Sequence, residues 1–396
     1  MTVYASNGKI LLKLPTNNEN KNMSTIKIEH LKKSYGHNLA VNDLSLELQD
    51  GELFALLGSS GCGKTTTLRC IAGLEEFDSG KISLDGEDIS QVPACDRDFG
   101  MVFQNYALFP HLSVQENVAY GLMAKRYRQS SLIGKAATLW RSISGSLTNE
   151  DKKAVHEVLD MVELKDYALR LPSQLSGGQQ QRAALARALV TKPKILLFDE
   201  PLGALDVKLR LKMREEIRHI QRQAGITALY VTHDQEEALA VSDRLALMDK
   251  GQIVQIGQPE ELYSKPANKF AAEFIGFGNI LSATINEDKT VSLAGNLVLQ
   301  NIQVSPTLAK GKIYAAIRPE KLKLSANTRN GSPNCFPAKV TSRMFMGNFI
   351  KYTVLCQGQT FIINVAADQG KNEGQPQIGQ ELTLYIPSES VVLVKE

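Results

Sequence analysis

The sequence predicts an α/β domain built on a parallel sheet, followed by a smaller all-β domain. Between residues 24 and 278, strand-like runs alternate with helical runs in the strand, helix, strand order of a parallel sheet. One of these strands leads into a glycine-rich motif at residues 58–65 that is typical of phosphate-binding loops. Residues 279–396 contain only short strand-like runs separated by turn residues. We expect residues 1–23, which are rich in Asn and Lys, to be a disordered tail.

The composition excludes several classes of function. The 396 residues are 43% hydrophobic, and 45 Lys and Arg residues nearly balance 42 Asp and Glu residues, which argues against nucleic acid as a partner. The five cysteines form no C-x-x-C pair, which argues against a disulfide framework or a zinc site and favours a reducing cytoplasm. No apolar run approaches the roughly 18 residues needed to span a bilayer. We therefore expect a cytoplasmic chain that does not itself cross a membrane.

The first part of the larger domain is rich in strands. We predict strands within residues 26–31, 39–48, 52–58 and 80–89, which are short β-type runs separated by Gly, Asn and Asp. The run LFALLG at 53–58 is almost entirely apolar. Such a run is expected for a strand that is buried on both faces of a parallel sheet.

The second part of this domain alternates helices with strands. Residues 113–171 are predicted to be largely helical. Strand-like runs follow at 194–200 and 227–233, and the helical run 207–225 between them ends on a glycine. One apolar helical stripe is expected to face the core, formed by Val155, Val158, Leu159 and Val162.

The motif G-x-x-x-x-G-K-[ST] at residues 58–65 indicates the phosphate-binding loop of a P-loop NTPase. Its glycines let backbone N–H groups surround the phosphates of ATP, Lys64 reaches the β- and γ-phosphates, and the Thr65 hydroxyl can bind Mg²⁺. A glycine-rich turn without function is the alternative. The residues expected to contact the nucleotide are Gly58, Ser59, Ser60, Gly61, Cys62, Gly63, Lys64, Thr65 and Thr66.

One cysteine lies inside this motif. Cys62 is close to the predicted helix N-terminus and near Lys64, and both features lower the pKa of a thiol. We therefore expect Cys62 to be alkylated faster than Cys70 or Cys95, and MgATP to slow its reaction.

Two carboxylates end the apolar run ILLFDE at 195–200. A strand end beside the phosphate loop is where an acid that organises Mg²⁺ belongs. We expect Asp199 to hold the metal through water, and Glu200 to orient or deprotonate the attacking water. The alternative is that both acids are solvated loop residues.

Four further motifs occur in a fixed order along the chain, together with the phosphate motif at 58–65 and the run ILLFDE at 195–200. Together the six motifs make residues 24–260 resemble the ATP-binding subunits of ABC transporters, whose ABC cassette includes a helical subdomain. The four motifs are GMVFQ at 100–104, LSGGQ at 175–179, GALD at 203–206 and VTHD at 231–234.

The resemblance implies roles for single residues of these motifs. Gln104 is expected to contact Mg²⁺ and the catalytic water, and His233 to hold the γ-phosphate. Asp206 is expected to link two active sites. Tyr35 is expected to stack on adenine, with an ordinary loop tyrosine as the alternative.

The resemblance also implies a head-to-tail dimer, either with a second copy or with a second ATPase subunit. In this family LSGGQ of one chain closes over the nucleotide held by the phosphate loop of the other. The Ser176 hydroxyl and the backbone N–H groups of Gly177 and Gly178, followed by Gln179, would face that nucleotide at a positive helix end.

The stretches 317–324 and 345–354 resemble the TOBE domain, an OB-like β domain of importer ATPases. The segment 105–122 resembles the part of polyamine, ferric-iron, phosphonate and sugar importers that receives the coupling helix of the membrane subunit. We therefore expect a peripheral subunit at the cytoplasmic face of the inner membrane, bound to permease subunits and served indirectly by an extracytoplasmic solute-binding protein.

Polyamine and ferric-iron importers are the branch that the sequence favours. The alternative is an ABC ATPase that acts on ribosomes or nucleic acid instead of a transporter. Such a protein is expected to carry two cassettes or a long coiled coil, and this sequence has one uninterrupted cassette and no heptads.

Residues from about 122 to 149 form an insertion relative to the family pattern. A basic amphipathic helix is expected there, which either touches an anionic membrane or packs its stripe on the helical subdomain. We favour packing. The apolar stripe is Leu132, Ala136, Leu139 and Ile143, and the nearby basic residues are Lys125, Arg126, Arg128, Lys135 and Arg141.

Overall fold

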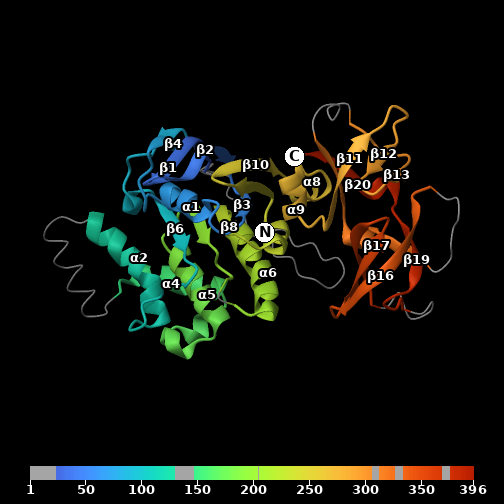
Figure 1. Ribbon diagram of the computed structural model, residues 1–396. Helices are drawn as coiled ribbons and strands as arrows, with labels where there is room; N and C mark the ends of the chain where they lie inside the picture. Colours follow the sequence, from blue (N-terminus) through green and yellow to red (C-terminus); the bar gives the residue numbers. More distant parts are fainter. Residues whose placement is uncertain (1–23, 130–146, 204, 306–311, 326–332, 368–374) are drawn as a thin grey trace, which may run out of the picture.

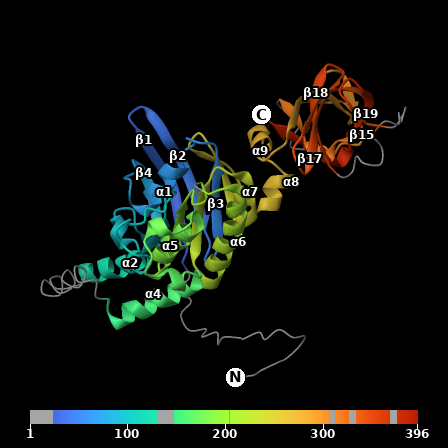
Figure 2. The ribbon, with the colours of Figure 1, turned by 90° about the horizontal axis from the view of Figure 1, so that it is seen from below.

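The computed structural model describes residues 24–129, 147–203, 205–305, 312–325, 333–367 and 375–396. These residues form an α/β body and a β-rich body, which meet at two short helices, α8 (Pro259–Ser264) and α9 (Lys269–Phe274) (Figures 1 and 2). Within the described ranges, no helix has the length and apolar character needed to cross a membrane. The expected tail at 1–23 and the stripe from Leu132 to Ile143 lie outside the described residues.

A six-stranded sheet forms the centre of the α/β body, in the order β10-β9-β3-β8-β7-β6. All its neighbouring strands are parallel except β10, which pairs antiparallel with β9. All six residues of β3 are buried, as the apolar run LFALLG predicts. The strands are β3 (Leu53–Gly58), β6 (Phe99–Val102), β7 (Ile195–Asp199), β8 (Thr227–Thr232), β9 (Arg244–Asp249) and β10 (Gln252–Gly257).

A smaller antiparallel sheet covers one side of this centre, in the order β2-β1-β4-β5. Its inward side chains, such as Ile28, pack with Leu68 of helix α1 and with Leu197 of β7 in one buried cluster. The elements are β1 (Ile26–Tyr35), β2 (Asn38–Leu48), β4 (Ser79–Leu84), β5 (Glu87–Asp88) and α1 (Lys64–Ala72).

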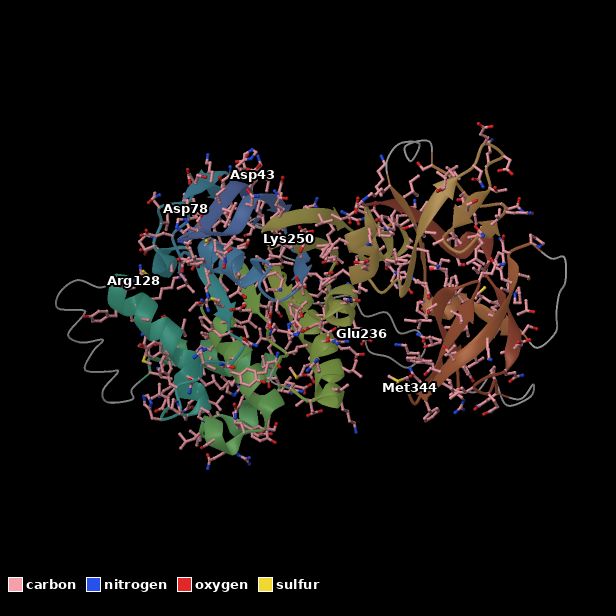
Figure 3. The ribbon with its side chains drawn as sticks, in the orientation of Figure 1. Asp43, Asp78, Arg128, Glu236, Lys250 and Met344 are labelled. Atoms are coloured by element: carbon pink, nitrogen blue, oxygen red, sulfur yellow. The ribbon has the colours of Figure 1, made fainter. Side chains whose placement is uncertain are left out.

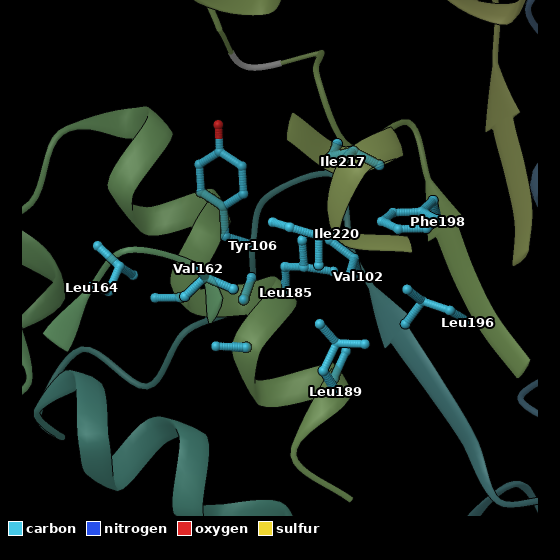
Figure 4. Close-up of a cluster of buried hydrophobic side chains, with 14 of the residues drawn as sticks. Val102, Tyr106, Val162, Leu164, Leu185, Leu189, Leu196, Phe198, Ile217 and Ile220 are labelled. Atoms are coloured by element: carbon cyan, nitrogen blue, oxygen red, sulfur yellow. The ribbon is translucent and has the colours of Figure 1, made fainter. Parts of the chain in front are cut away.

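The opposite face of the central sheet is covered by the other large helices. Alternate residues of a strand point to opposite faces, so Phe198 of β7 joins a second cluster together with Leu185 and Ile217 (Figure 4). The predicted stripe is confirmed, because Val155, Leu159 and Val162 are buried in this cluster and Val158 packs against it. The helices are α2 (Val114–Gln129), α4 (Asn149–Met161), α5 (Gly177–Leu189), α6 (Val207–Ala224) and, against β3 and β8, α7 (Gln235–Val241).

Two five-stranded antiparallel sheets form the β-rich body, in the orders β13-β12-β11-β14-β20 and β15-β19-β16-β17-β18. Residues from both sheets share one buried apolar cluster, in agreement with the predicted all-β domain. The strands are β11 (Asn279–Ile285), β12 (Val291–Leu293), β13 (Leu297–Leu299), β14 (Ile313–Ile317), β15 (Lys323–Ser325), β16 (Cys335–Phe345), β17 (Phe349–Cys356), β18 (Gln359–Ala366), β19 (Glu381–Tyr385) and β20 (Val391–Lys395).

Arg318 joins the two bodies. It is 6% exposed and donates hydrogen bonds to the carbonyl oxygens of Ile275 at 3.0 Å and Tyr263 at 2.6 Å. Its guanidinium carbon lies 3.4 Å from the centroid of the Tyr263 ring and 4.1 Å from that of Phe277. A buried cation held by carbonyl groups and aromatic rings is a specific contact between the bodies.

The last turns of α2 carry basic residues that already have acidic partners. Lys125 lies 2.8 Å from Asp98, and Arg128, at the outer end of the helix in Figure 3, pairs with Asp96. Arg126 pairs with Asp151 of α4 at 2.6 Å. These ion pairs support the packing interpretation for the described start of the insertion.

Candidate active site

The phosphate motif forms the loop between β3 and α1, as predicted. A Cβ on Gly58 would lie 2.4 Å from the Met248 carbonyl oxygen. Gly63 has φ +105°, and a Cβ there would lie 2.2 Å from the carbonyl oxygen of Ala40. No side chain caps α1 at Gly63, so the first N–H groups of the helix are left for an anion. The loop therefore fits a phosphate group.

The other residues of this loop also lie where the motif predicts. Lys64 is 3% exposed, and its Nζ donates hydrogen bonds to the carbonyl oxygens of Gly58 at 2.9 Å and Ser59 at 2.8 Å. These bonds hold the ammonium group inside the loop. Ser59, Ser60 and Gly61 are exposed at the tip of the loop, and Thr65 and Thr66 are half-buried at the start of α1.

The expected direction of the Cys62 pKa shift is wrong, whereas the expected order of alkylation and the effect of MgATP stay predictions. The thiol is buried, and burial raises its pKa more than the charge of nearby Lys64 lowers it. The Nζ of Lys64 lies 3.9 Å from Sγ and is already hydrogen-bonded to the two loop carbonyls. Cys95, by contrast, is exposed.

Thr65 and Asp199 come together although they are far apart in the sequence. The Thr65 hydroxyl donates a hydrogen bond of 3.2 Å to Oδ1 of Asp199, which ends β7. Burial raises the pKa of Asp199, while the Thr65 hydrogen bond and the positive Arg69 and Lys64 oppose that shift. Across the described ranges no three His, Cys, Asp or Glu side chains form a metal cage. A hydroxyl and one carboxylate nevertheless suit Mg²⁺, which usually takes few protein ligands and completes its shell with phosphate and water.

Glu200, His233 and Gln104 converge next to this pair. Oε2 of Glu200 lies 3.1 Å from Nδ1 of His233 and 3.5 Å from Nε2 of Gln104. The three residues follow β7, β8 and β6, which are neighbours in the parallel sheet, so their carboxyl ends share one edge. Glu200 has φ +45°, and its N–H donates to the Val231 carbonyl oxygen at 3.0 Å. The strand ends therefore place a carboxylate between an imidazole and an amide.

Tyr35 ends β1, and the residue is 46% exposed. The ammonium group of Lys33 lies over the ring, 4.9 Å from its centroid. An exposed ring is available for stacking, but no hydrogen bond or ring contact of this tyrosine reaches the phosphate loop in the described chain. Its adenine contact therefore stays a prediction.

LSGGQ opens α5, as the helix-forming sequence after it suggests. Ser176 caps the helix: its Oγ accepts from the Gln179 N–H at 3.4 Å, and Gln179 Oε1 accepts from the Ser176 N–H at 2.9 Å. The sequence analysis did not use this reciprocal cap, although Ser followed three residues later by Gln is its signature. Within the described residues the Ser176 hydroxyl acts only as an acceptor, so its own proton is available to another partner.

The structure does not bring LSGGQ to the phosphate loop of its own chain. A Cβ on Gly177 would meet Leu205, and one on Gly178 would meet Leu209, both near the start of α6. No hydrogen bond joins residues 175–179 to residues 58–66, all of which are described. The helices α1 and α5 pack on opposite faces of the central sheet (Figure 1).

Asp206 has a structural role that the sequence analysis did not include. It caps α6, because its Oδ1 accepts from the Leu209 N–H at 3.0 Å. The residue is exposed.

Two protein families match the chain. The ABC transporter family matches residues 41–203, which contain the phosphate loop, LSGGQ and the two carboxylates. The TOBE domain matches residues 315–394, from β14 to β20.

The chain is also similar to named import proteins. It is 44% identical over 346 residues to the spermidine/putrescine import ATP-binding protein PotA of Haemophilus influenzae, covering 85% of this chain and 87% of that protein. It is 41% identical over 377 residues to the Fe(3+) ions import ATP-binding protein FbpC 1 of Pectobacterium atrosepticum, covering 95% and 99%. The solved dimeric structure of MJ0796, a bacterial ABC transporter cassette, covers 59% of this chain at 31% identity and a TM-score of 0.49. From its motifs, its two matching families and its similarity to the two import proteins, the chain belongs to the ATP-binding subunits of ABC transporters that carry a C-terminal TOBE domain.

Proposed function

We propose that this chain is the ATPase subunit of an ABC importer and hydrolyses ATP to drive solute through separate membrane subunits. The observation that carries the proposal is the placement of the Glu200 carboxylate between His233 and Gln104, beside the Thr65 and Asp199 pair. A carboxylate at that position can orient and deprotonate a water that attacks the γ-phosphate.

The remaining residues have supporting roles in this proposal. The amides of the loop and Lys64 bind the phosphates, and Tyr35 stacks on adenine. Thr65, Asp199 and Gln104 would hold Mg²⁺, which when bound neutralises charge on the phosphates. His233 holds the γ-phosphate while Glu200 receives the proton of the attacking water.

A second ATPase chain completes the site in this proposal. Because Ser176 and its two glycines lie away from their own phosphate loop, they are available to close over the nucleotide of a partner, with Asp206 between the two sites. The partner is a second copy or a related ATPase subunit.

A groove beside the helical subdomain supports permease binding. It has a volume of about 510 Å³ and lies along the segment after Gln104. Arg187 shapes it by donating hydrogen bonds to the carbonyl oxygens of Tyr106 at 2.8 Å and Ala107 at 2.6 Å. An apolar permease helix fits the aromatic residues of its lining, which include Phe99, Phe103, Phe109 and Tyr120. We infer a peripheral position at the cytoplasmic face of the inner membrane, with a solute-binding protein acting on the permease from the other side.

A single substitution tests the catalytic role. Glu200→Gln should lower MgATP turnover by at least about a hundredfold, because it removes the base and keeps the phosphate loop. Affinity for a fluorescent ATP analogue should stay within about twofold of the unaltered chain. Glu157→Gln, at an exposed position of α4, is the control and should leave both quantities unchanged. Near-normal turnover by Glu200→Gln removes Glu200 from this role, and an unaltered chain without turnover contradicts the function.

The solute is a polyamine or ferric iron in this proposal, because the relatives are import proteins for spermidine and putrescine or for Fe(3+) ions. Cells that lack the chain should lose uptake of labelled spermidine or of labelled ferric iron. The unaltered chain should restore that uptake and Glu200→Gln should not. Unchanged uptake of both solutes would contradict this assignment.

A further inference from the structure

We propose that Asp234, Arg210 and Arg214 form a positioning link between the loop that carries His233 and the loop that carries Asp206. Asp234 follows His233 directly and caps α7, since its Oδ1 accepts from the Glu237 N–H at 3.0 Å. Its other oxygen, Oδ2, accepts hydrogen bonds from Arg210 at 3.4 Å and Arg214 at 3.2 Å, both on α6. The inference rests on the proposed ATPase function.

Arg210 makes the connection to the second loop. While one terminal nitrogen reaches Asp234, the other donates a hydrogen bond of 3.1 Å to the carbonyl oxygen of Leu205. Leu205 is buried and directly precedes Asp206, the cap of α6. A guanidinium group presents several N–H donors in a rigid plane, so one side chain can bind both acceptors at once.

Arg214 reinforces the same junction from one turn further along α6. Its side chain is 9% exposed and also lies 3.7 Å from Glu236, which Figure 3 shows beside α6. Asp234 is thus held by two cations, one of them almost fully buried. Pairs of this kind are costly to break, because a buried charge is then left without its partner.

The residue before His233 is held as well. The Thr232 hydroxyl donates to Glu237 Oε2 at 2.5 Å and accepts from the Asp234 N–H at 3.0 Å. Glu237 is 4% exposed and also accepts a hydrogen bond from the buried Tyr230 hydroxyl. Both residues next to His233 in the sequence, Thr232 and Asp234, are therefore held by hydrogen bonds. The distance from His233 to Glu200 depends on where these two neighbours are held.

The consequence concerns the timing of hydrolysis. In the proposed dimer, Asp206 meets the partner chain, so closure of the dimer moves the backbone at Leu205. Arg210 transfers that movement to Asp234 and hence to His233, which touches Glu200. The link therefore connects the position of the partner chain to the position of His233.

Two substitutions test the link in the full chain. Arg210→Lys keeps the charge but cannot bind Leu205 and Asp234 together, and Asp234→Asn keeps the helix cap but loses the charge. Each should lower kcat for MgATP by about tenfold and leave KM within about twofold, because the geometry changes and the phosphate loop does not. The double variant should be no slower than the slower single variant, because both changes break one link.

Arg218→Lys is the matched control. Arg218 lies on the same helix and pairs with Asp243, which follows α7, but it touches neither loop. Its kcat should stay close to that of the unaltered chain. Its thermal midpoint should shift by about as much as the midpoints of Arg210→Lys and Asp234→Asn. Unchanged kcat in Arg210→Lys and Asp234→Asn, additive losses in the double variant, or an equal loss in Arg218→Lys would overturn the link. If the unaltered chain hydrolyses no ATP, the proposed function itself is wrong.

Discussion

At the scale of single residues, Gly63 shows how tightly the phosphate loop is built. A side chain there would need φ +105° and would bring its Cβ to 2.2 Å from the backbone oxygen of Ala40. Gly86 has a similar φ, +83°, but nothing lies within 4 Å of the Cβ position. A comparison of substitutions at the two glycines therefore distinguishes the effect of steric overlap from the effect of backbone strain.

We expect Gly86→Ala to lower the free energy of unfolding by about 1–2 kcal/mol, since only backbone strain is added. Gly63→Ala should lower the free energy of unfolding by more than Gly86→Ala does. It should also weaken ATP binding, because the loop must move away from Ala40. Chemical denaturation and titration with a fluorescent ATP analogue measure the two effects. Equal losses of stability in the two variants would contradict the steric explanation.

Cys62 marks a limit of sequence analysis at the same scale. The local sequence correctly indicates a helix N-terminus and a nearby lysine, both of which lower the pKa of a thiol. Burial of the thiol by the folded chain acts in the opposite direction and is the larger effect. Burial depends on residues distant in the sequence, such as Met248, which share the apolar cluster with Cys62.

At the scale of elements, the parts predicted well are those whose signal is local. The buried strand at 53–58, the loop after it and the carboxylates at the end of β7 follow from patterns within short stretches. The helix stripe that includes Val155 follows from a 3.6-residue period.

The parts that were not predicted depend on partners distant in the sequence. The Arg318 contact with Tyr263 joins residues 55 positions apart, and the Arg214 contact with Asp234 joins residues 20 positions apart. Neither partner could be chosen from periodicity or composition. The cap formed by Ser176 and Gln179 is different, because its signal was present and the phosphate-binding interpretation displaced it.

At the scale of the whole molecule, the central sheet separates the two helix starts that the sequence predicts to bind anions. Helix α1, with the phosphate loop, packs on one face, and α5, with LSGGQ, packs on the other. A single chain therefore does not bring the two together, and in the proposed dimer a second ATPase chain supplies the missing LSGGQ motif. The proposed dimer explains why one cassette carries both.

A double variant tests whether LSGGQ acts on the partner. In a Glu200→Gln background, MgATP should trap a dimer that size-exclusion chromatography detects. Adding Ser176→Arg should abolish that dimer, because Ser176 is exposed and a bulky side chain would stand in the closing interface. Affinity for a fluorescent ATP analogue, measured at concentrations too low for dimerisation, should remain close to its previous value.

Ser176→Arg also removes a helix cap, which costs about 1 kcal/mol of stability. Thr148→Arg is the matched control, because Thr148 caps α4 in the same reciprocal manner, with its hydroxyl accepting from the Asp151 N–H at 3.2 Å. It should lose similar stability and still form the trapped dimer. If Thr148→Arg also prevents dimerisation, the defect comes from the lost cap. If Ser176→Arg instead weakens ATP binding by the monomer, LSGGQ acts within its own chain and the head-to-tail arrangement is wrong.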